Sequence, residues 1–391
     1  MIYLDNAATT KVRREVLDEM LPYFSEYYTN PSSIYSPSRM VSKKVEEARK
    51  LIAGTIGAEA SEIYFTSGGS ESDNWAIKKI MISRMNKGKH MITTKVEHHA
   101  VLESCKYLES LGFEVTYLNV NEDGLIDLNE LESSIREDTI LVSIMAANNE
   151  IGTLMPLKEI GSICKKHKVL FHTDAVQAYG NIPIDVNEMN IDLLSTSAHK
   201  IEGPKGIGFL YVRKGVMITP LISGGMQEKG KRAGTTNAPG IIGFAKACEL
   251  KFSEIKKNNE YVLNLREHLI DRVLSEIPYV RLNGSRDKRL VGNANFSFQF
   301  IEGEGMLLKL DALGICASSG SACTSGSLDP SHVLLAIGLP HEIAHGSLRL
   351  TMNHENTMEE IDYTVDKLKE VISGLRSMSP LYEDFVKKGS N

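Results

Sequence analysis

Two side chains with catalytic potential follow short apolar runs, at positions where the strands of an open α/β sheet would end. Lys200 follows the run 192–196, and Asp174 follows the run 168–172. A lysine in such a cleft can have a lowered pKa and form a Schiff base, although it could also be a surface lysine. Asp174 could pair with the protonated ring nitrogen of a cofactor, or cap a helix.

The turn Ser67-Gly68-Gly69-Ser70 follows another apolar run and precedes a helical pattern. It places backbone N–H groups at a helix N-terminus, where a phosphate is favoured. The sequence is neither a P-loop nor GxGxxG, so a nucleotide site is disfavoured.

His98 begins another predicted helix, in the sequence Glu-His-His. It could be a metal ligand, a general acid, a ring stacked on a planar cofactor, or a structural histidine. No partner at metal-ligand spacing lies nearby, so a metal site is the least favoured of these.

Cys323 lies in the run Ser-Ser-Gly-Ser-Ala-Cys-Thr-Ser-Gly-Ser, which has little apolar content. The run predicts an exposed, mobile loop, and a cysteine in such a loop is a candidate reactive thiolate or an incidental surface thiol. The other four cysteines lie in apolar or helical patterns and are predicted to pack in the interior: Cys105, Cys164, Cys248 and Cys316.

Arg349 lies in Ser-Leu-Arg-Leu-Thr, an alternating pattern typical of a half-buried strand. A buried arginine needs a carboxylate, which it grips with two parallel hydrogen bonds. The partner could be the carboxylate of a substrate or an internal acid.

These side chains require a sheet to bring them together. From about residue 60 to 215, short apolar runs alternate with amphipathic stretches, which predicts βαβ units and a mostly parallel sheet covered by helices. A long charged helix is predicted at Lys246–Ile277. The C-terminal part contains a strand at Asn293–Phe300 and an amphipathic helix near Thr357–Leu375. Expected strands of the sheet are Glu62–Thr66, His90–Lys95, Phe113–Val120, Thr139–Ala146, Lys168–His172, Asp192–Thr196 and Gly206–Val212.

The length and composition of the chain disfavour several classes of function. The chain has 391 residues, which favours two domains. Its net charge of −6 disfavours nucleic acid as the main ligand. Five cysteines at irregular spacing fit neither a disulfide framework nor a zinc site, so reduced thiols in a cytoplasm are expected. Neither a secretory signal nor an apolar run long enough for a membrane helix is recognisable.

Taken together, the segments resemble the cysteine desulfurases of the NifS/IscS type, which are fold-type I pyridoxal-phosphate (PLP) enzymes of the class V aminotransferase group. The resemblance extends over nearly the whole chain. It rests on Tyr3-Leu-Asp-Asn-Ala-Ala-Thr-Thr, Asn30-Pro-Ser-Ser, Phe65-Thr-Ser-Gly-Gly-Ser-Glu-Ser-Asp-Asn, Glu97-His-His-Ala-Val, Asn148-Asn-Glu-Ile-Gly, His172-Thr-Asp-Ala-Val-Gln, Ser197-Ala-His-Lys-Ile-Glu-Gly-Pro-Lys-Gly, Arg232-Ala-Gly-Thr, Ser318-Ser-Gly-Ser-Ala-Cys-Thr-Ser and Arg349.

The resemblance implies a large PLP-binding domain with a mostly parallel seven-stranded sheet, at 15–255. It implies a smaller α+β domain, at 1–14 and 256–391, that carries the cysteine loop. It also implies a homodimer with shared active sites, in which Thr235 reaches the phosphate of the neighbouring subunit's cofactor.

The resemblance further implies roles at the active site. Lys200 would carry PLP and act as acid and base, while Asp174 would pair with the pyridine nitrogen. His98 would stack on the ring, and Cys323 would attack the sulfur of L-cysteine, leaving L-alanine and a persulfide for a sulfur acceptor. The remaining expected contacts are Asn149 and Gln177 at the substrate side and ring hydroxyl, Gly69, Ser70, Ser197 and His199 at the phosphate, and Arg349 with Asn30 at the cysteine carboxylate.

Several positions depart from the usual pattern of that group: Tyr35, Lys231, Glu202 and the pair Met352-Asn353. None is an expected cofactor ligand, so they bear on the subfamily and the acceptor. The acceptor could be an iron–sulfur scaffold or a partner in cofactor or tRNA thiolation. Two other hypotheses for the function remain open. One is a PLP enzyme that catalyses another reaction, such as a selenocysteine lyase, and the other is an inactive docking scaffold.

Overall fold

The computed structural model describes residues 1–319 and 330–389. Its largest element is a seven-stranded sheet in the order β2-β8-β7-β6-β5-β3-β4. The five strands from β3 to β7 pair in parallel with one another, and β8 is antiparallel to both β2 and β7. The predicted mostly parallel seven-stranded sheet is therefore confirmed. Its strands are β2 (Ile63–Thr66), β3 (His90–Thr94), β4 (Glu114–Leu118), β5 (Thr139–Ser143), β6 (Leu170–Asp174), β7 (Leu193–Ser195) and β8 (Gly208–Val212).

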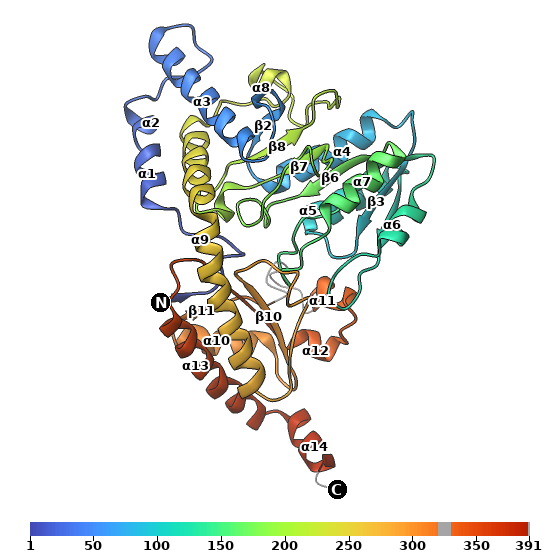
Figure 1. Ribbon diagram of the computed structural model, residues 1–391, viewed down its shortest axis with the longest axis vertical. Coiled ribbons are helices and arrows are strands. Elements are labelled where there is room, and N and C mark those ends of the chain that lie inside the picture. The colour runs from blue at the N-terminus through green and yellow to red at the C-terminus, as the bar shows by residue number, and fades with distance from the viewer. Residues whose placement is uncertain (320–329, 390–391) are drawn as a thin grey trace.

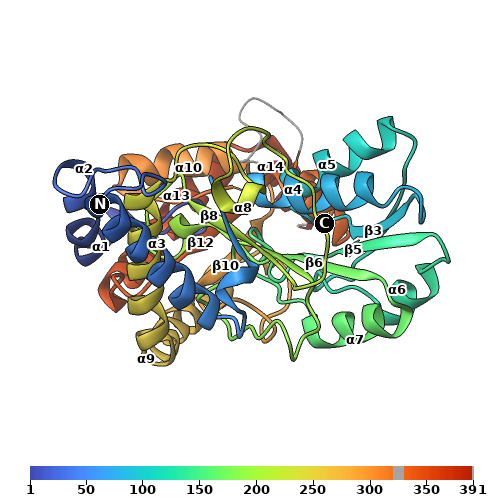
Figure 2. The same cartoon turned by 90° about the horizontal axis from the view of Figure 1, so that it is seen from above.

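Helices cover both faces of this sheet, because successive strand residues point to opposite faces. Leu141 and Leu193 pack with apolar residues of α4 (Gly69–Ser83) and α5 (His99–Ser110). Their neighbours Val142 and Leu194 pack into the opposite core, which includes α3 (Ser36–Gly54) and α7 (Leu157–His167). Figure 2 shows α4 and α5 above the sheet, with α7 and α6 (Leu128–Ser134) below it.

The helix α9 (Ala238–Glu276) is 39 residues long and runs from the large sheet to the smaller one (Figure 1). It begins eight residues before the predicted start, at a polar cap. The Asn237 side chain accepts a hydrogen bond from the N–H of Gly240, and Pro239 lies in the first turn, where a missing N–H costs nothing. Its first part packs against the large-sheet core, and from Val262 onward it packs into a second core.

That second core belongs to a smaller α+β layer. A three-stranded antiparallel sheet has the order β12-β10-β9, and β1 pairs in parallel with β11. The N-terminal strand thus joins the C-terminal part of the chain, and Leu4 lies in the core there. The elements are β1 (Ile2–Tyr3), β9 (Val280–Leu282), β10 (Asn293–Phe298), β11 (Ile315–Cys316), β12 (Ser347–Thr351), α10 (Gly303–Ala312), α13 (Met358–Ser377) and α14 (Pro380–Gly389).

Shorter helices complete the described chain. Among them, α11 contributes Val333 and Leu334 to the large-sheet core, although it follows the small sheet's strands in sequence. We propose the division into 15–255 against 1–14 and 256–391, with α9 crossing the boundary. The short helices are α1 (Arg14–Met20), α2 (Pro22–Ser25), η1 (Ala60–Glu62), η2 (Ala198–Lys200), α8 (Gln227–Gly230), α11 (His332–Ala336) and α12 (His341–His345).

Three cysteines are buried as predicted, namely Cys105, Cys164 and Cys248, and Cys316 is half-buried in β11. All four have free thiols. Among the described helices, none is both long enough and apolar enough to span a bilayer.

Candidate active site

A cavity of about 420 Å³ opens where the carboxyl ends of the central strands meet the small layer. It collects most of the residues that the sequence singled out. Asn30 and Thr235 do not line it, because both are exposed side chains of other surface segments. Cys323 lies outside the described residues. The predicted residues in the cavity wall are Gly69, Ser70, His98, Asn149, Asp174, Gln177, Ser197, His199, Lys200 and Arg349.

The short turn η2, which follows β7, places Lys200 in this cavity. Its Nζ donates hydrogen bonds to the carbonyl oxygens of Ala7 (2.5 Å) and Ala8 (2.7 Å). The side chain of Gln177 donates to the same Ala7 oxygen at 3.0 Å. The N-terminal segment therefore forms one wall of the site and orients the amine.

The N-terminus of α4 forms an anion cradle. Within residues 1–319 and 330–389 the residue before this helix makes no side-chain cap, and the N–H groups of a first helical turn have no intrahelical partner. Gly68 has φ of +150°, and a Cβ on Gly69 would approach Cγ2 of Val176 to 2.5 Å, so the close backbone approach requires glycine. Ser197, which directly precedes η2, lies close to this turn, with its hydroxyl oxygen 3.5 Å from where a Cβ on Gly68 would stand.

His199 lies beside the cradle without adding a positive charge. Burial lowers its pKa to about 4, and its Nδ1 contacts the hydroxyl of Thr9 at 3.1 Å. A neutral imidazole can donate one N–H to an anion, whereas the charge there comes from the helix end.

Asp174 and His98 lie on neighbouring segments of the cavity wall. Asp174 is 5% exposed, and its Oδ1 accepts the N–H of Val176 at 2.9 Å. Burial raises its pKa, while His98 and Lys200 oppose that shift. His98 caps α5 by accepting the N–H of Ala100 at Nδ1, and burial lowers its pKa. The neutral ring therefore carries its proton on Nε2.

Arg349 is held by an internal acid and still has donor capacity. Its Nη2 lies 2.9 Å from Oδ1 of Asp5, and its Nη1 donates to the carbonyl of Asn149 at 2.9 Å. Within the described residues its Nε has no hydrogen-bond partner. The internal acid is therefore one partner of this arginine, and the Nε–H is left without a partner in the described residues of a side chain that lines the cavity.

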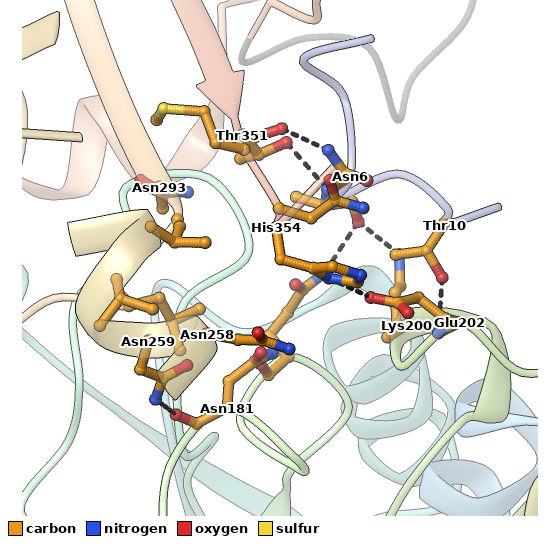
Figure 3. Close-up of a pocket in the computed structure, with 18 of the residues that line it drawn as sticks. Asn6, Thr10, Asn181, Lys200, Glu202, Asn258, Asn259, Asn293, Thr351 and His354 are labelled. Atoms are coloured by element: carbon orange, nitrogen blue, oxygen red, sulfur yellow. Dashed lines mark hydrogen bonds and ion pairs between the residues drawn. The ribbon is translucent and has the colours of Figure 1, made fainter. Parts of the chain in front are cut away.

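A second, smaller cavity of about 70 Å³ also has Lys200 in its wall (Figure 3). Its volume suits a few water molecules, each of which needs roughly 10–15 Å³ by this measure. The wall contains Glu202, whose Oε1 lies 3.3 Å from Nδ1 of His354. Met352 and Asn353 line the same cavity. Three of the positions that depart from the family pattern, Glu202, Met352 and Asn353, thus line this second cavity. None of the three lines the main cavity.

Sequence reasoning missed several residues of the main cavity. Asp73 could have been found, because it lies three positions after Ser70 and shares its helix face. Asp5 had no local signal, since its pairing with Arg349 spans 344 residues. The other unforeseen wall residues are Ala7, Ala8, Met145, Val176 and Ser318.

The donor set fits PLP. An amine, a buried carboxylate, a neutral imidazole and an uncapped helix end line one cavity, and two buried polar atoms there, Nε of Arg349 and Oδ1 of Asp73, have no partner in the described chain. A phosphorylated ring with an amino-acid substrate supplies groups of matching chemistry. Among the described residues, no cluster of His, Cys, Asp and Glu is suited to a metal ion.

Comparison with known proteins agrees with this chemistry. Residues 2–364 match the aminotransferase class-V family. "Cysteine desulfurase IscS" of Methanosarcina thermophila is 56% identical over 97% of this chain and 94% of its own. A protein of the same name from Clostridium botulinum is 55% identical over 99% and 98%.

Solved structures are similar over most of their length. A "NifS-like protein" superposes with a TM-score of 0.91 at 40% identity, covering 96% of this chain and 100% of that one. "SspA in complex with cysteine" has a TM-score of 0.81 at 39% identity, covering 90% and 99%.

Proposed function

Because this chain belongs to the class-V aminotransferase family, and within it to the cysteine desulfurases of the NifS/IscS type, we propose that it is a PLP-dependent enzyme that converts L-cysteine to L-alanine and transfers the sulfur to Cys323. One observation carries the proposal for the site: a single cavity contains Lys200, Asp174 and Arg349. An amine, an acid and a guanidinium are the groups needed to hold the cofactor and an amino acid together.

The cofactor-binding residues surround that cavity. Lys200 would hold the carbonyl carbon of the cofactor, Asp174 would pair with its ring nitrogen, and His98 would pack on its ring. Once bound, PLP supplies an electron sink beside the substrate. The remaining contacts in the proposal are Gly69, Ser70, Ser197 and His199 at the phosphate, and Asn149 and Gln177 at the ring hydroxyl and substrate.

The chain's own groups then bind the substrate and move protons. Arg349 binds the carboxylate of cysteine through the N–H that Asp5 leaves unused. Lys200 takes and returns protons at Nζ, which the carbonyls of Ala7 and Ala8 orient. The carboxylate of Asp174 stays ionised to stabilise positive charge on the ring nitrogen.

The sulfur step needs one more group, a thiolate. The thiolate of Cys323 attacks the sulfur of the bound cysteine, so that an S–S bond forms and the C–S bond breaks. The electron pair of the broken bond stays on the carbon, which takes a proton to complete alanine. Cys323 is left as a persulfide, and no external oxidant or reductant is required.

We propose that the enzyme is a homodimer. The segment 21–35 exposes large apolar side chains, among them Phe24 (62%), Tyr28 (72%) and Ile34 (90%). A patch of this kind on one chain is typical of a surface that another chain covers. Asn30 lies in this segment and Thr235 is exposed elsewhere, so both remain candidates for contacts across the dimer.

The persulfide needs an acceptor protein in the same compartment, which we take to be the cytoplasm. An iron–sulfur scaffold or a sulfur carrier for cofactor or tRNA thiolation has the required chemistry. The relatives named IscS make transfer to an acceptor the simplest expectation.

The test uses purified protein with PLP and L-cysteine. We expect a visible cofactor band, equimolar alanine and sulfide in the presence of a thiol reductant, and one added sulfur in the intact mass. Cys323→Ala should keep the band and lose both sulfide and added mass. The matched control, Cys316→Ala, removes a thiol that does not line the cavity and should keep both.

Two results would redirect the assignment. Full turnover of cysteine by C323A would favour a PLP enzyme with a different reaction. A protein that stays colourless with added PLP would favour a docking scaffold.

A further inference from the structure

Asp73 is a buried carboxyl to which the proposed function gives no role. It lies on α4, one turn after Ser70, and it lines the cofactor cavity. Its side chain is only 1% exposed, and Oδ1 has no hydrogen-bond partner among the described residues. A buried polar atom without a hydrogen bond destabilises the fold. Such an atom in the wall of a ligand cavity therefore indicates either that a bound ligand is its partner or that the carboxyl is protonated.

No cation in the described chain offsets a charge on Asp73. The nearest basic group is Nε2 of His172, at 3.7 Å. Both ring nitrogens of His172 contact serine hydroxyls, Nδ1 that of Ser143 at 2.8 Å and Nε2 that of Ser195 at 3.0 Å. Burial lowers the pKa of His172 to about 3, so the ring is neutral near pH 7. It cannot balance a carboxylate.

The other charged groups that act on Asp73 are themselves acids. Burial raises the pKa of Asp73 well above its ordinary value, and the nearby Asp174 raises it further. A hydrogen bond with the hydroxyl of Ser195 lowers this pKa, and Glu97 raises it by a smaller amount. Glu97 is fully buried, and burial raises its pKa to about 8, so it too holds its proton near pH 7. Of two interacting carboxyls in a buried site, one takes the proton. Asp174 accepts a backbone N–H, and the positive charge of Lys200 favours its ionised form, so Asp174 is the one that ionises.

We propose that Asp73 is a positioning residue that remains a neutral acid, donates its O–H on the cavity side, and leaves Asp174 as the ionised member of this pair of carboxyls. This inference rests on the proposed function, because that function assigns Asp174 to the ring nitrogen. It extends the proposed function by adding a second acid, Asp73, whose protonation keeps Asp174 ionised.

The first test measures PLP binding to apoprotein by fluorescence of Trp75, the only tryptophan, which lies two residues from Asp73 on the same helix. Asp73→Asn keeps a neutral donor, and we expect its dissociation constant within about threefold of wild type. Asp73→Leu keeps the approximate shape without the donor, and we expect binding about tenfold weaker, the effect of one hydrogen bond.

Either of two binding results would overturn the proposal. D73N weakened tenfold or more would mean that Asp73 acts as an anion. D73L equal to wild type would mean that no donor is needed. If wild-type apoprotein fails to bind PLP at all, the proposed function fails instead, and the second test still reports on Asp73.

The second test needs no cofactor. An acid whose pKa is raised in the folded state stabilises the fold at low pH, and this contribution is lost as pH rises above the unfolded pKa of about 4. The folding equilibrium of D73N relative to wild type should therefore improve by up to about tenfold per pH unit above pH 4. D311N, which removes an exposed carboxyl at the end of α10, controls for the loss of one negative charge. Parallel pH curves for D73N and wild type in urea unfolding would refute a protonated Asp73.

Discussion

The contact between Arg349 and Asp5 gives the sharpest prediction about the substrate. In the structure the guanidinium is 4% exposed, and it is shared between an internal acid, the carbonyl of Asn149 and an unused Nε–H. Arg349→Gln removes the charge and the guanidinium fork and leaves a shorter, neutral amide. We expect this variant to lose both substrate binding and stability, for two separable reasons.

The two losses have different sizes and origins. A hydrogen bond to a charged group contributes about 1.5–3 kcal/mol, so kcat/KM for cysteine should fall about 10- to 150-fold. In addition, removing one partner of a buried ion pair costs about 3–5 kcal/mol, because the other charge is left unpaired. The side chain of Asp5 is 17% exposed, so the lower end of that range is expected for the free energy of unfolding.

A double-mutant cycle separates the two effects. The variants are Arg349→Gln, Asp5→Asn and the double variant, and each is measured by sulfide release at varied cysteine and by urea unfolding of the PLP-loaded protein. Asp5→Asn in the Arg349→Gln background removes the unpaired acid, so it should restore most of the stability. It should not restore kcat/KM, because the group that binds the substrate carboxylate is still missing.

The reasoning fails if the two properties recover together. Recovery of both kcat/KM and stability in the double variant would mean that Arg349 acts only by holding the fold. A value of kcat/KM for Arg349→Gln within about threefold of wild type would mean that the cysteine carboxylate binds elsewhere.

Three further predictions concern the cofactor amine, pH and one buried ion pair. Lys200→Ala should retain no PLP after borohydride reduction and should lose more than about 100-fold in cysteine turnover, which mass spectrometry and sulfide assays would check. Because His172 is neutral and buried, its unfolded form takes up a proton below pH 6.5 while the folded form does not. The free energy of unfolding should therefore fall by about 1.4 kcal/mol for each unit by which the pH is lowered in that range. His172→Gln should reduce this pH dependence of the free energy of unfolding, as measured by urea titrations at several pH values. Glu228→Gln should cost about 3–5 kcal/mol of stability, because the buried Arg49, 2.6 Å away, loses its buried partner and keeps only the exposed Glu46. Glu46→Gln removes an exposed partner of the same Arg49 and should cost less than about 1 kcal/mol in the same unfolding assay.

Much of the site was predictable because strand periodicity and chain topology are local properties. Alternating apolar runs located the strands of the large sheet to within a few residues. The rule that ligands bind at the carboxyl ends of parallel strands then brought Asp174 and Lys200 to one edge. Both residues line the cavity, as does the glycine turn before α4.

Other features depended on contacts between distant segments. Glu202 was noticed only as an unusual residue, and its pairing with His354 at the second cavity needs two segments that are 152 positions apart to meet. Asn30 was expected at the substrate, yet within this chain it is an exposed residue of the loop before α3. A pattern of residues along the sequence does not indicate how close two such segments lie in the folded chain.

The sequence by itself determined the chemical groups, the order of the strands along the chain and the family, because side-chain type and periodicity are written residue by residue. The tertiary structure decided which groups share an environment. It paired Asp5 with Arg349, brought the carbonyls of Ala7 and Ala8 to Lys200, and buried Asp73 among other acids without a cation. The physical reason is that charge state and donor geometry depend on neighbours and on the exclusion of water, and both exist only once the chain has folded.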